Sequence, residues 1–263
     1  MIDKVVILAA GLGNRIARAT SVPKPFLPLD GTDGGKTFVD WHIEQFARRG
    51  VKEIYVVGNK LTSQRALPRP EGCAVTWILN PTDDINTSGS GHSAWFAWQS
   101  PHGILDGRSR VVLMDADILY EPAVLDALDG APGGPSKTLI CGDYRESQEE
   151  VMVFGQGDRA LLHGKGLLGT SLVAPYEVFG EATGMLLWEP QDHARLREAT
   201  DWCMRYSTAK VKSEHEDITQ RMMWAGHVAA VRFSHLRFME CDTPEEYAHL
   251  TREFYPAVRA LIP

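Results

Sequence analysis

The stretch Lys4–Arg15, KVVILAAGLGNR, decides the fold. Its first part, Lys4–Ala10, is an almost entirely apolar run of the kind found in strands that are buried on both faces of a parallel sheet. Glycines follow at once, and glycine lets the backbone approach a ligand closely and present its N–H groups to an anion. The stretch therefore predicts a buried first strand of an α/β sheet that leads into a phosphate-binding loop.

Strands and helices alternate after this loop. Thr37 as N-cap and Gly50 after the last turn predict a helix over 37–49. A further helix is expected at Ser90–Gln99, and strands are expected at Glu53–Gly58, Ala74–Leu79 and Arg110–Met114. The alternation is typical of a three-layer α/β/α, Rossmann-like fold with a mostly parallel central sheet.

The second half of the chain is less regular. Apolar runs predict strands at Val151–Phe154, Leu161–His163, Met185–Trp188, Val228–Phe233 and Arg237–Glu240, and helical patterns cover Gln191–Met204 and Asp217–Ala225. A last helix is expected from a capping box, with Thr243 at the N-cap, Pro244 at N1 and Glu246 at N3. We expect a single domain over residues 1–263.

Composition excludes several classes of protein. The chain has 263 residues, 44% of them hydrophobic, and a net charge of -7, which gives no global attraction to nucleic acid or anionic membranes. Its apolar runs are too short for a signal peptide or a membrane-spanning helix, and its four scattered cysteines form no CxxC pair. We expect a cytoplasmic monomer or homodimer that binds neither nucleic acid nor membrane.

Several cations and carboxylates lie at positions of the sequence where an α/β protein commonly binds its ligand. Arg15 and Lys24 suit phosphate oxygens, although a plain glycine turn with two surface cations is the simpler interpretation. Asp117 and its neighbour Asp115 follow a buried strand, where they could bind Mg²⁺ or merely cap a turn. Because Thr243 is the better N-cap, the side chain of Asp242 is free to bind a ligand. Alternatively, Asp242 merely interacts favourably with the dipole of the following helix.

The segments LAAGLGNR (8–15) and PKPFLPLDG (23–31) resemble the signature of the nucleotidyltransferase superfamily, and are closest to its phosphocholine and phosphonate cytidylyltransferases. The resemblance implies a glycine loop around the triphosphate and catalytic roles for Arg15 and Lys24 at the α-phosphorus. It further implies that Asp117 and Asp242 bind Mg²⁺, with Glu240 as a secondary candidate. Its implied nucleotide-binding residues are Leu8, Ala10, Gly11, Gly13, Asn80, Ser90 and Ser93.

Selectivity follows from the same resemblance. Gly89–Ser93 resembles the turn that reads the base, although ordinary helix capping explains it equally well, and Asn86-Thr87 favours CTP. For the acceptor, Lys165, Trp188 and Glu216 are candidates, with Tyr176 and Trp202 as further aromatic residues. The tryptophans could instead belong to the core, and the acidic run around Glu216 could be a charged helix start.

We therefore expect a nucleotidyltransferase that transfers CMP from CTP to a small phosphate or phosphonate acceptor, either phosphocholine-like or an aminoalkylphosphonate, with release of pyrophosphate. Residues 1–130 would bind the nucleotide, and residues 131–263 would bind the acceptor. A sugar-1-phosphate nucleotidyltransferase that uses UTP, dTTP or GTP is the main alternative, and a non-catalytic nucleotide-sensing module is a more distant one. An NAD oxidoreductase is disfavoured because the third glycine of GxGxxG is replaced and the second strand lacks an acidic end.

Overall fold

The computed structural model describes residues 1–11, 13, 15–16, 21–82, 88–130, 133–144, 148–207, 212–226 and 228–262. A nine-stranded sheet with the order β3-β2-β1-β4-β9-β6-β10-β8-β7 runs through these residues. The expected helices and strands are confirmed with ends shifted by one or two residues, except that the strand expected at Met185–Trp188 already begins at Glu177. Among the described residues, no helix is both long and apolar enough to cross a membrane.

The part of the sheet built from the first half of the chain is parallel. β1 (Lys4–Leu8) pairs in parallel with β2 (Glu53–Gly58) on one side and with β4 (Val111–Asp115) on the other. β3 (Ala74–Leu79) extends the sheet in parallel beyond β2. The carboxyl ends of β1 and β4 lie side by side, since Leu8 is opposite Asp115, and ligands collect at this edge of an open α/β sheet.

The part of the sheet built from the second half of the chain corrects the expectation of a mostly parallel sheet, because it makes the sheet mixed. β9 (Glu177–Trp188) runs antiparallel between β4 and β6 (Ser136–Cys141), and β10 (Val228–Phe233) is parallel to β6. β7 (Met152–Gln156) and β8 (Arg159–Gly164) form an antiparallel hairpin, and β7 also pairs antiparallel with β9. A connection as short as Gly157-Asp158 permits only an antiparallel pair, since a parallel neighbour needs a long crossover.

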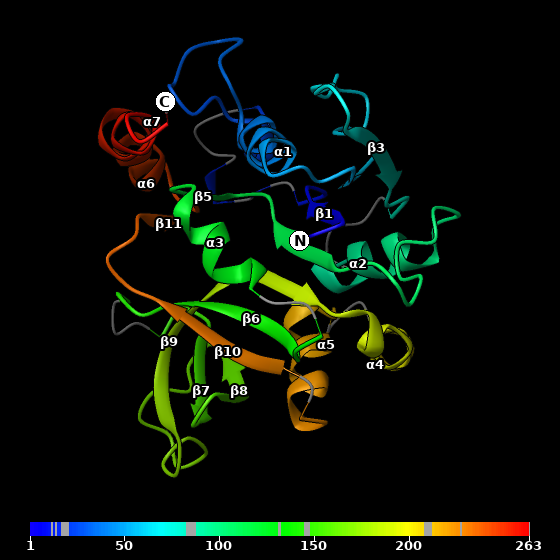
Figure 1. Cartoon of the computed structure of the whole chain (residues 1–263). Helices are drawn as coiled ribbons and strands as arrows, with labels where there is room; N and C mark the ends of the chain where they lie inside the picture. The colour runs from blue at the N-terminus through cyan, green and yellow to red at the C-terminus, as the bar shows by residue number, and fades with distance from the viewer. Residues whose placement is uncertain are drawn as a thin grey trace.

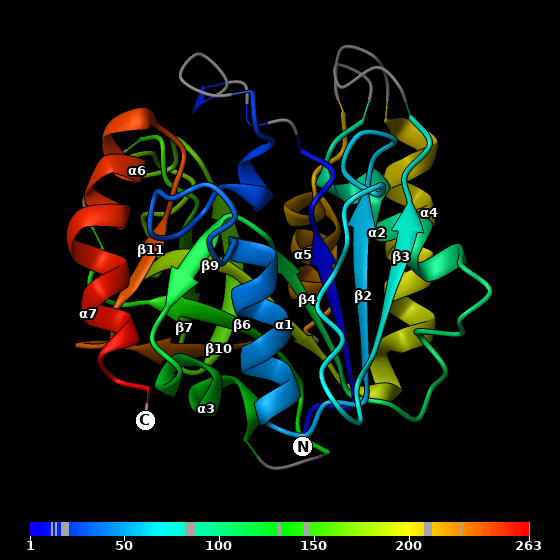
Figure 2. The ribbon, with the colours of Figure 1, turned by 90° about the horizontal axis from the view of Figure 1, so that it is seen from above.

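Helices cover both faces of the sheet (Figures 1 and 2). Val5 and Ile7 of β1 join one core cluster, and Val6 and Leu8, which alternate with them, join another. The first cluster packs against α1 (Phe38–Arg48), α3 (Ala123–Asp129), the π-helical turn η4 (Leu250–Phe254) and α7 (Tyr255–Arg259). The second packs against α2 (Ser90–Gln99), α4 (His193–Tyr206) and α5 (His215–Trp224).

A small second sheet positions the site. β11 (Phe238–Glu240) pairs antiparallel with β5 (Ile118–Tyr120), and Glu240 lies opposite Ile118. The backbone N–H of Cys241 donates to the carbonyl of Asp117 across 3.1 Å. The chain segments that carry Asp117 and Asp242 are therefore held together by backbone hydrogen bonds, although they are far apart in sequence.

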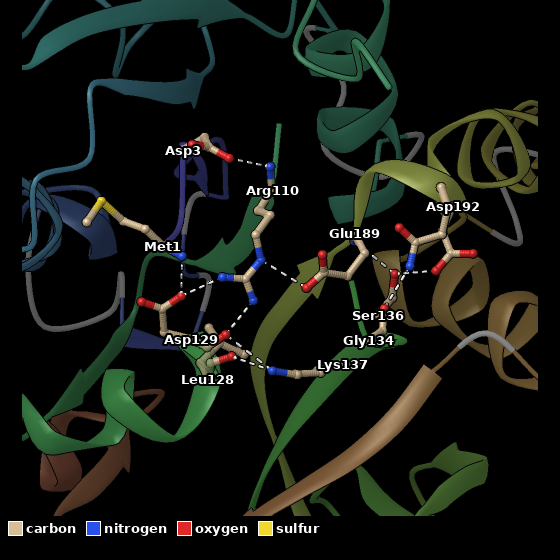
Figure 3. A network of polar contacts seen from close by, with 11 residues as sticks. Met1, Asp3, Arg110, Leu128, Asp129, Gly134, Ser136, Lys137, Glu189 and Asp192 are labelled. Atoms are coloured by element: carbon tan, nitrogen blue, oxygen red, sulfur yellow. Dashed lines mark hydrogen bonds and ion pairs between the residues drawn. The ribbon is translucent and has the colours of Figure 1, made fainter. Parts of the chain in front are cut away.

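A polar network at the opposite end of β4 joins the two halves (Figure 3). Arg110, only 4% exposed, donates from Nε to Glu189 across 2.9 Å and from a terminal nitrogen to Asp129 across 2.6 Å. Glu189 is connected through its backbone N–H to Ser136, at the start of β6. Buried charges need such partners, so this end of the sheet is tied together structurally rather than open to a ligand.

Candidate active site

Lys24 lies at the centre of the candidate active site. It begins the short 3₁₀ helix η2 (Lys24–Phe26), and its Nζ contacts the carboxylates of both Asp117 and Asp242. Burial acts to lower the pKa of Lys24, but these two carboxylates outweigh burial and raise the pKa well above its ordinary value. The ammonium group is therefore a permanent cation at neutral pH.

The glycine loop packs directly against this lysine. Gly13 has φ +64°, which favours glycine, and a Cβ placed on Gly13 would lie 2.7 Å from the Cβ of Lys24. Any larger side chain at position 13 would therefore push Lys24 away. Arg15 follows at the mouth of the site, 59% exposed, and donates to Asp242 across 2.5 Å.

The end of β11 and the start of α6 (Pro244–His249) orient Asp242. Thr243 caps α6 by accepting from the N–H of Glu246 across 3.2 Å, so the predicted capping box is confirmed. Glu246 in return accepts from the backbone N–H groups of Asp242 and Thr243 across 2.7 and 2.9 Å. The Asp242 side chain is left to face Lys24 and Arg15. Burial acts to raise its pKa, and Lys24 and Arg15 outweigh that effect and lower it.

A group of three carboxylates at this point could hold a metal ion. Asp117, Glu240 and Asp242 each contribute an oxygen, and these oxygens lie within 4.8 Å of one another. Mg²⁺ prefers hard oxygen ligands and takes one or two carboxylates together with waters and substrate phosphates. The donor set therefore fits Mg²⁺.

The larger cavity begins at this centre and encloses about 650 Å³. The residues expected to bind nucleotide all line it: Leu8, Ala10, Gly11, Gly13, Asn80, Ser90 and Ser93, together with Arg15, Asp117 and Asp242. Asn86-Thr87, which favoured CTP, lies outside the described residues. A cavity of this size and polarity can accommodate a nucleotide.

The candidate base-reading turn is held by α5. Ser90 donates from its backbone N–H and its hydroxyl to Glu214 across 2.6 and 2.8 Å, and the N–H of Gly91 donates to the carbonyl of Ser213. Asn80 donates to Ser93 across 3.0 Å. Both donors of Ser90 are therefore already used within the protein. Ser90 lines the cavity, but it has no free donor to offer a base.

Among the residues of this cavity that the sequence did not single out are Asn59 and Glu214. Asn59 donates to the carbonyl of Ala10 across 2.8 Å and so supports the glycine loop, while Glu214 lines the cavity beside Ser90. Asn59 was detectable only as a polar residue directly after a buried strand. Glu214 lies in an acidic run that is equally typical of a charged helix start.

A smaller cavity of about 60 Å³ lies on the other side of Asp115, which lines both cavities. Lys165 and Glu216, two of the candidate acceptor residues, line it. Trp188 does not, and this expectation is corrected. It is completely buried and lies opposite Val111, at the end of β4 remote from Asp115, because the antiparallel course of β9 carries its last residue away from the site. Tyr176 and Trp202 are exposed and do not line this cavity either.

Asp115 is paired with a residue that the sequence did not single out. His215, 4% exposed, contacts Asp115 from Nε2 across 2.8 Å, and its Nδ1 lies 3.6 Å from Glu216. Burial acts to lower the pKa of His215, but the carboxylates of Asp115 and Glu216 outweigh it and raise the pKa to about 10. The cavity wall therefore contains a buried imidazolium at neutral pH.

Comparisons with known proteins agree with this geometry. A family described as "MobA-like NTP transferase domain" matches residues 5–173. The CMP-5'-(3-aminopropyl)phosphonate synthase of Streptomyces rubellomurinus (strain ATCC 31215) is 33% identical over 133 residues, which are 49% of this chain and only 19% of that protein.

Solved structures share the fold at low sequence identity. The inositol-1-phosphate CTP transferase from T. maritima has a TM-score of 0.69 and 16% identity, over 95% of this chain and 96% of that one. A UDP-glucose pyrophosphorylase complexed with UDP-glucose has a TM-score of 0.72 and 16% identity, over 98% and 100%.

Proposed function

The chain belongs to the MobA-like NTP transferase family and is a nucleotidyltransferase, and we propose that it transfers CMP from CTP to a small phosphate or phosphonate acceptor. One observation carries the proposal. Lys24 contacts both Asp117 and Asp242, Arg15 contacts Asp242, and one nucleotide-sized cavity is lined by Arg15, both aspartates and the glycine loop.

The reaction needs no general base. One oxygen of the acceptor phosphate or phosphonate attacks the α-phosphorus in line, the new O–P bond forms, and the bond from the α-phosphorus to the bridging oxygen breaks as pyrophosphate leaves. A phosphate monoester has its second pKa near ~6, so the attacking oxygen is largely ionised at neutral pH. Catalysis then consists of positioning and charge stabilisation.

Different residues of the site stabilise the α-phosphate, bind the leaving pyrophosphate and hold the metal ion. Lys24, which is buried and permanently charged, stabilises the negative charge that grows on the α-phosphate oxygens. Arg15 and the N–H groups of the glycine loop bind the leaving pyrophosphate at the open side of the site. Asp117, Asp242 and Glu240 would hold Mg²⁺, which supplies charge neutralisation for the phosphates when it is bound.

Nucleotide binding would require the ion pairs at the centre of the site to rearrange. Lys24 and Arg15 contact the aspartates directly, so the phosphates of the incoming nucleotide must replace these contacts. Mg²⁺ at the aspartates would neutralise the carboxylates and free both cations for phosphate. We therefore expect nucleotide and metal to bind cooperatively.

The names of two similar proteins support the proposed preference for CTP. The relative from Streptomyces rubellomurinus is a CMP-phosphonate synthase, and the structural neighbour from T. maritima is a CTP transferase. The acceptor would occupy the smaller cavity, where Lys165 supplies a cation for its phosphate or phosphonate group.

A substrate panel tests the proposal. Release of pyrophosphate is measured with CTP, UTP, dTTP, GTP and ATP, each combined with phosphocholine, 2-aminoethylphosphonate, 3-aminopropylphosphonate, inositol-1-phosphate and glucose-1-phosphate. We expect turnover with CTP and a phosphonate or phosphocholine-like acceptor. Turnover with UTP, dTTP or GTP and the hexose phosphate would instead establish a sugar-1-phosphate nucleotidyltransferase. Binding of CTP without turnover of any acceptor would contradict the proposed reaction.

A further inference from the structure

Two helices that line different cavities begin against each other. α2 starts at Ser90, in the turn that lines the larger cavity, and α5 starts at His215, which lines the smaller one. The two starting residues lie 125 positions apart in the sequence, yet they are hydrogen-bonded. Their contact is therefore a direct link between the walls of the two cavities.

Each helix start supplies a hydrogen-bond acceptor to the other. The hydroxyl of Ser90 accepts from the backbone N–H of His215 across 2.8 Å. Glu214, the residue before α5, accepts in return from the backbone N–H and the hydroxyl of Ser90 across 2.6 and 2.8 Å. Because the first N–H groups of a helix have no partner within that helix, Ser90 and Glu214 satisfy these groups for each other's helix. The single hydroxyl of Ser90 takes part both as a donor and as an acceptor.

The glycines on either side of Ser90 fit the same contact. A Cβ on Gly89 would lie 2.3 Å from the carbonyl oxygen of Ser213, and a Cβ on Gly91 would lie 2.8 Å from the same oxygen. Gly89 has φ -100°, which any residue can adopt, so the close approach of α5 rather than backbone freedom requires a glycine there. The sequence of this turn therefore matches the start of α5, and this observation is independent of the hydrogen bonds.

The first turn of α5 continues into the wall of the smaller cavity. The side chain of His215 contacts Asp115 across 2.8 Å, and Asp115 lines both cavities. From the side of β8, His163 donates from Nε2 to the carbonyl of Glu216 across 2.7 Å. All four of these residues line the smaller cavity. A shift in the first turn of α5 would therefore displace several groups of that wall together.

We propose that Ser90 is a positioning residue for the acceptor: its hydroxyl fixes the first turn of α5 and, through His215, the position of Asp115 in the wall of the smaller cavity. The proposal rests on the proposed function, which places the acceptor in that cavity. It differs from the base-reading role that the sequence suggests for Ser90. Although Ser90 lines the nucleotide cavity, its effect appears at the other substrate.

Steady-state kinetics of Ser90→Ala separate the two roles. Alanine removes the hydroxyl, and with it the bond from His215 and one of the two bonds to Glu214. For the acceptor of the substrate panel with the highest kcat/KM, we expect KM to rise about 3- to 10-fold, as for the loss of one or two hydrogen bonds, while KM for CTP changes less than about 2-fold. The ratio of kcat/KM for CTP to that for UTP should stay at the wild-type value.

Three further variants test whether the hydroxyl itself is responsible. Ser90→Thr keeps a hydroxyl and should restore the acceptor KM. Gly91→Ala disturbs the same contact without removing a hydrogen-bonding group, so it should raise the acceptor KM as Ser90→Ala does. The matched control is Ser100→Ala at the opposite end of α2, where the hydroxyl donates to the carbonyl of Ala97 across 2.8 Å and lines neither cavity. This control should keep both KM values.

Thermal unfolding checks that each variant folds, and Gly91→Ala carries the test if Ser90→Ala does not fold. An unchanged acceptor KM in the folded variant would overturn the inference, and a lowered preference for CTP over UTP would assign Ser90 to base reading instead. Equal effects of Ser90→Ala and Ser100→Ala would reduce the role of Ser90 to stability. In each of these cases, turnover by the wild-type protein leaves the proposed function standing. Absence of turnover with every acceptor would refute the proposed function and this inference together.

Discussion

His215 contacts Asp115 across 2.8 Å, although the two residues lie 100 positions apart in the sequence. Their pairing connects the carboxyl end of β4 with the first residue of α5. Asp115 lines both cavities, and the backbone N–H of His215 donates to Ser90 in the candidate base-reading turn. The pair therefore connects the walls of the two cavities.

This pair should make stability depend on alkaline pH. The pKa of His215 is raised from 6.5 to about 10 on folding, so the folded state holds its proton more tightly than the unfolded state. The resulting stabilisation is fully present below pH 6.5 and is lost as the pH rises to about 10. We expect this residue to account for a decrease in the free energy of unfolding of the order of 1–3 kcal/mol over that range.

Urea denaturation at a series of pH values measures this effect. His215→Asn keeps a donor for Asp115 but does not titrate, so its free energy of unfolding should depend less on pH than that of the wild-type protein. Parallel loss of stability in the two proteins would show that other groups cause the alkaline transition.

Gly184 should be required for the placement of Asp115. It has φ +70°, and a Cβ at this position would lie 2.4 Å from Asp115 Oδ2. Gly184→Ala should displace that carboxylate, lower kcat at least about 10-fold and reduce stability by about 1–3 kcal/mol beyond the backbone strain of about 1–2 kcal/mol. Pyrophosphate release and chemical denaturation measure the two effects.

Gly157→Ala is the matched control for this substitution. Gly157 has φ +63° in the hairpin between β7 and β8, and a Cβ there would have no atom within 4 Å. The control should show the backbone strain without the loss of kcat. Equal behaviour of the two variants would mean that contact with Asp115 is irrelevant.

Asp117 should be essential for turnover but not for folding. Its carboxylate contacts Lys24 and belongs to the group that fits Mg²⁺. Asp117→Ala should lower kcat by at least about 100-fold, as expected when charge stabilisation at the reacting centre is lost. Asp126→Ala removes a carboxylate that is 73% exposed and paired with Arg49, outside both cavities, and should retain full activity. Unchanged turnover in Asp117→Ala, measured by pyrophosphate release, would exclude this residue from the reaction.

The N-cap of α6 should affect both stability and catalysis. Thr243→Ala removes the hydroxyl that accepts from Glu246, which typically costs about 1 kcal/mol. Because Asp242 immediately precedes this cap, its carboxylate should lose its fixed orientation, and kcat should fall several-fold. Kinetics and thermal unfolding are measured together.

Thr37→Ala provides the comparison. Thr37 caps α1 with the same geometry, accepting from Asp40 across 3.2 Å, but lines neither cavity. It should lose similar stability and keep its kcat. A similar decrease of kcat in both variants would indicate a general effect of reduced stability.

Local sequence patterns predicted the parts of the molecule that local chemistry controls. The glycine loop after β1 is one example, and the caps formed by Thr37 and Thr243 are others, because each depends on residues only a few positions apart. The availability of Asp242 followed directly from the capping box. These features required no knowledge of the tertiary structure.

The structure of the second half of the chain could not be derived in this way. The first part of β9 was missed because Glu177–Gly184 mixes polar residues with glycines, of which Gly180 and Gly184 have positive φ. This part of the strand begins exposed at Glu177 and Val178 and becomes fully buried only from Met185 onward. The strand β6 was missed as well, and no local pattern indicates that β9 would lie antiparallel beside β4.

Two residues show how strand pairing that the sequence does not reveal affected the prediction of the site. The aromatic side chain of Trp188 would suit a choline-like group, but the direction of β9 places this residue in the core. His215 lies in an acidic run that is typical of a helix start, and its contact with Asp115 depends on where α5 packs against the sheet. Both depend on contacts between segments that are distant in sequence.

The position of β9 has a consequence for any attempt to divide the protein. This strand belongs to the second half of the chain, yet it is hydrogen-bonded to β4 of the first half as well as to β6 and β7. Fragments produced separately by cutting near residue 133 would each expose an unpaired strand edge, a known template for aggregation. Co-expression should allow them to complement each other, so the chain offers a natural position for a split enzyme whose activity reports the association of two fused partners.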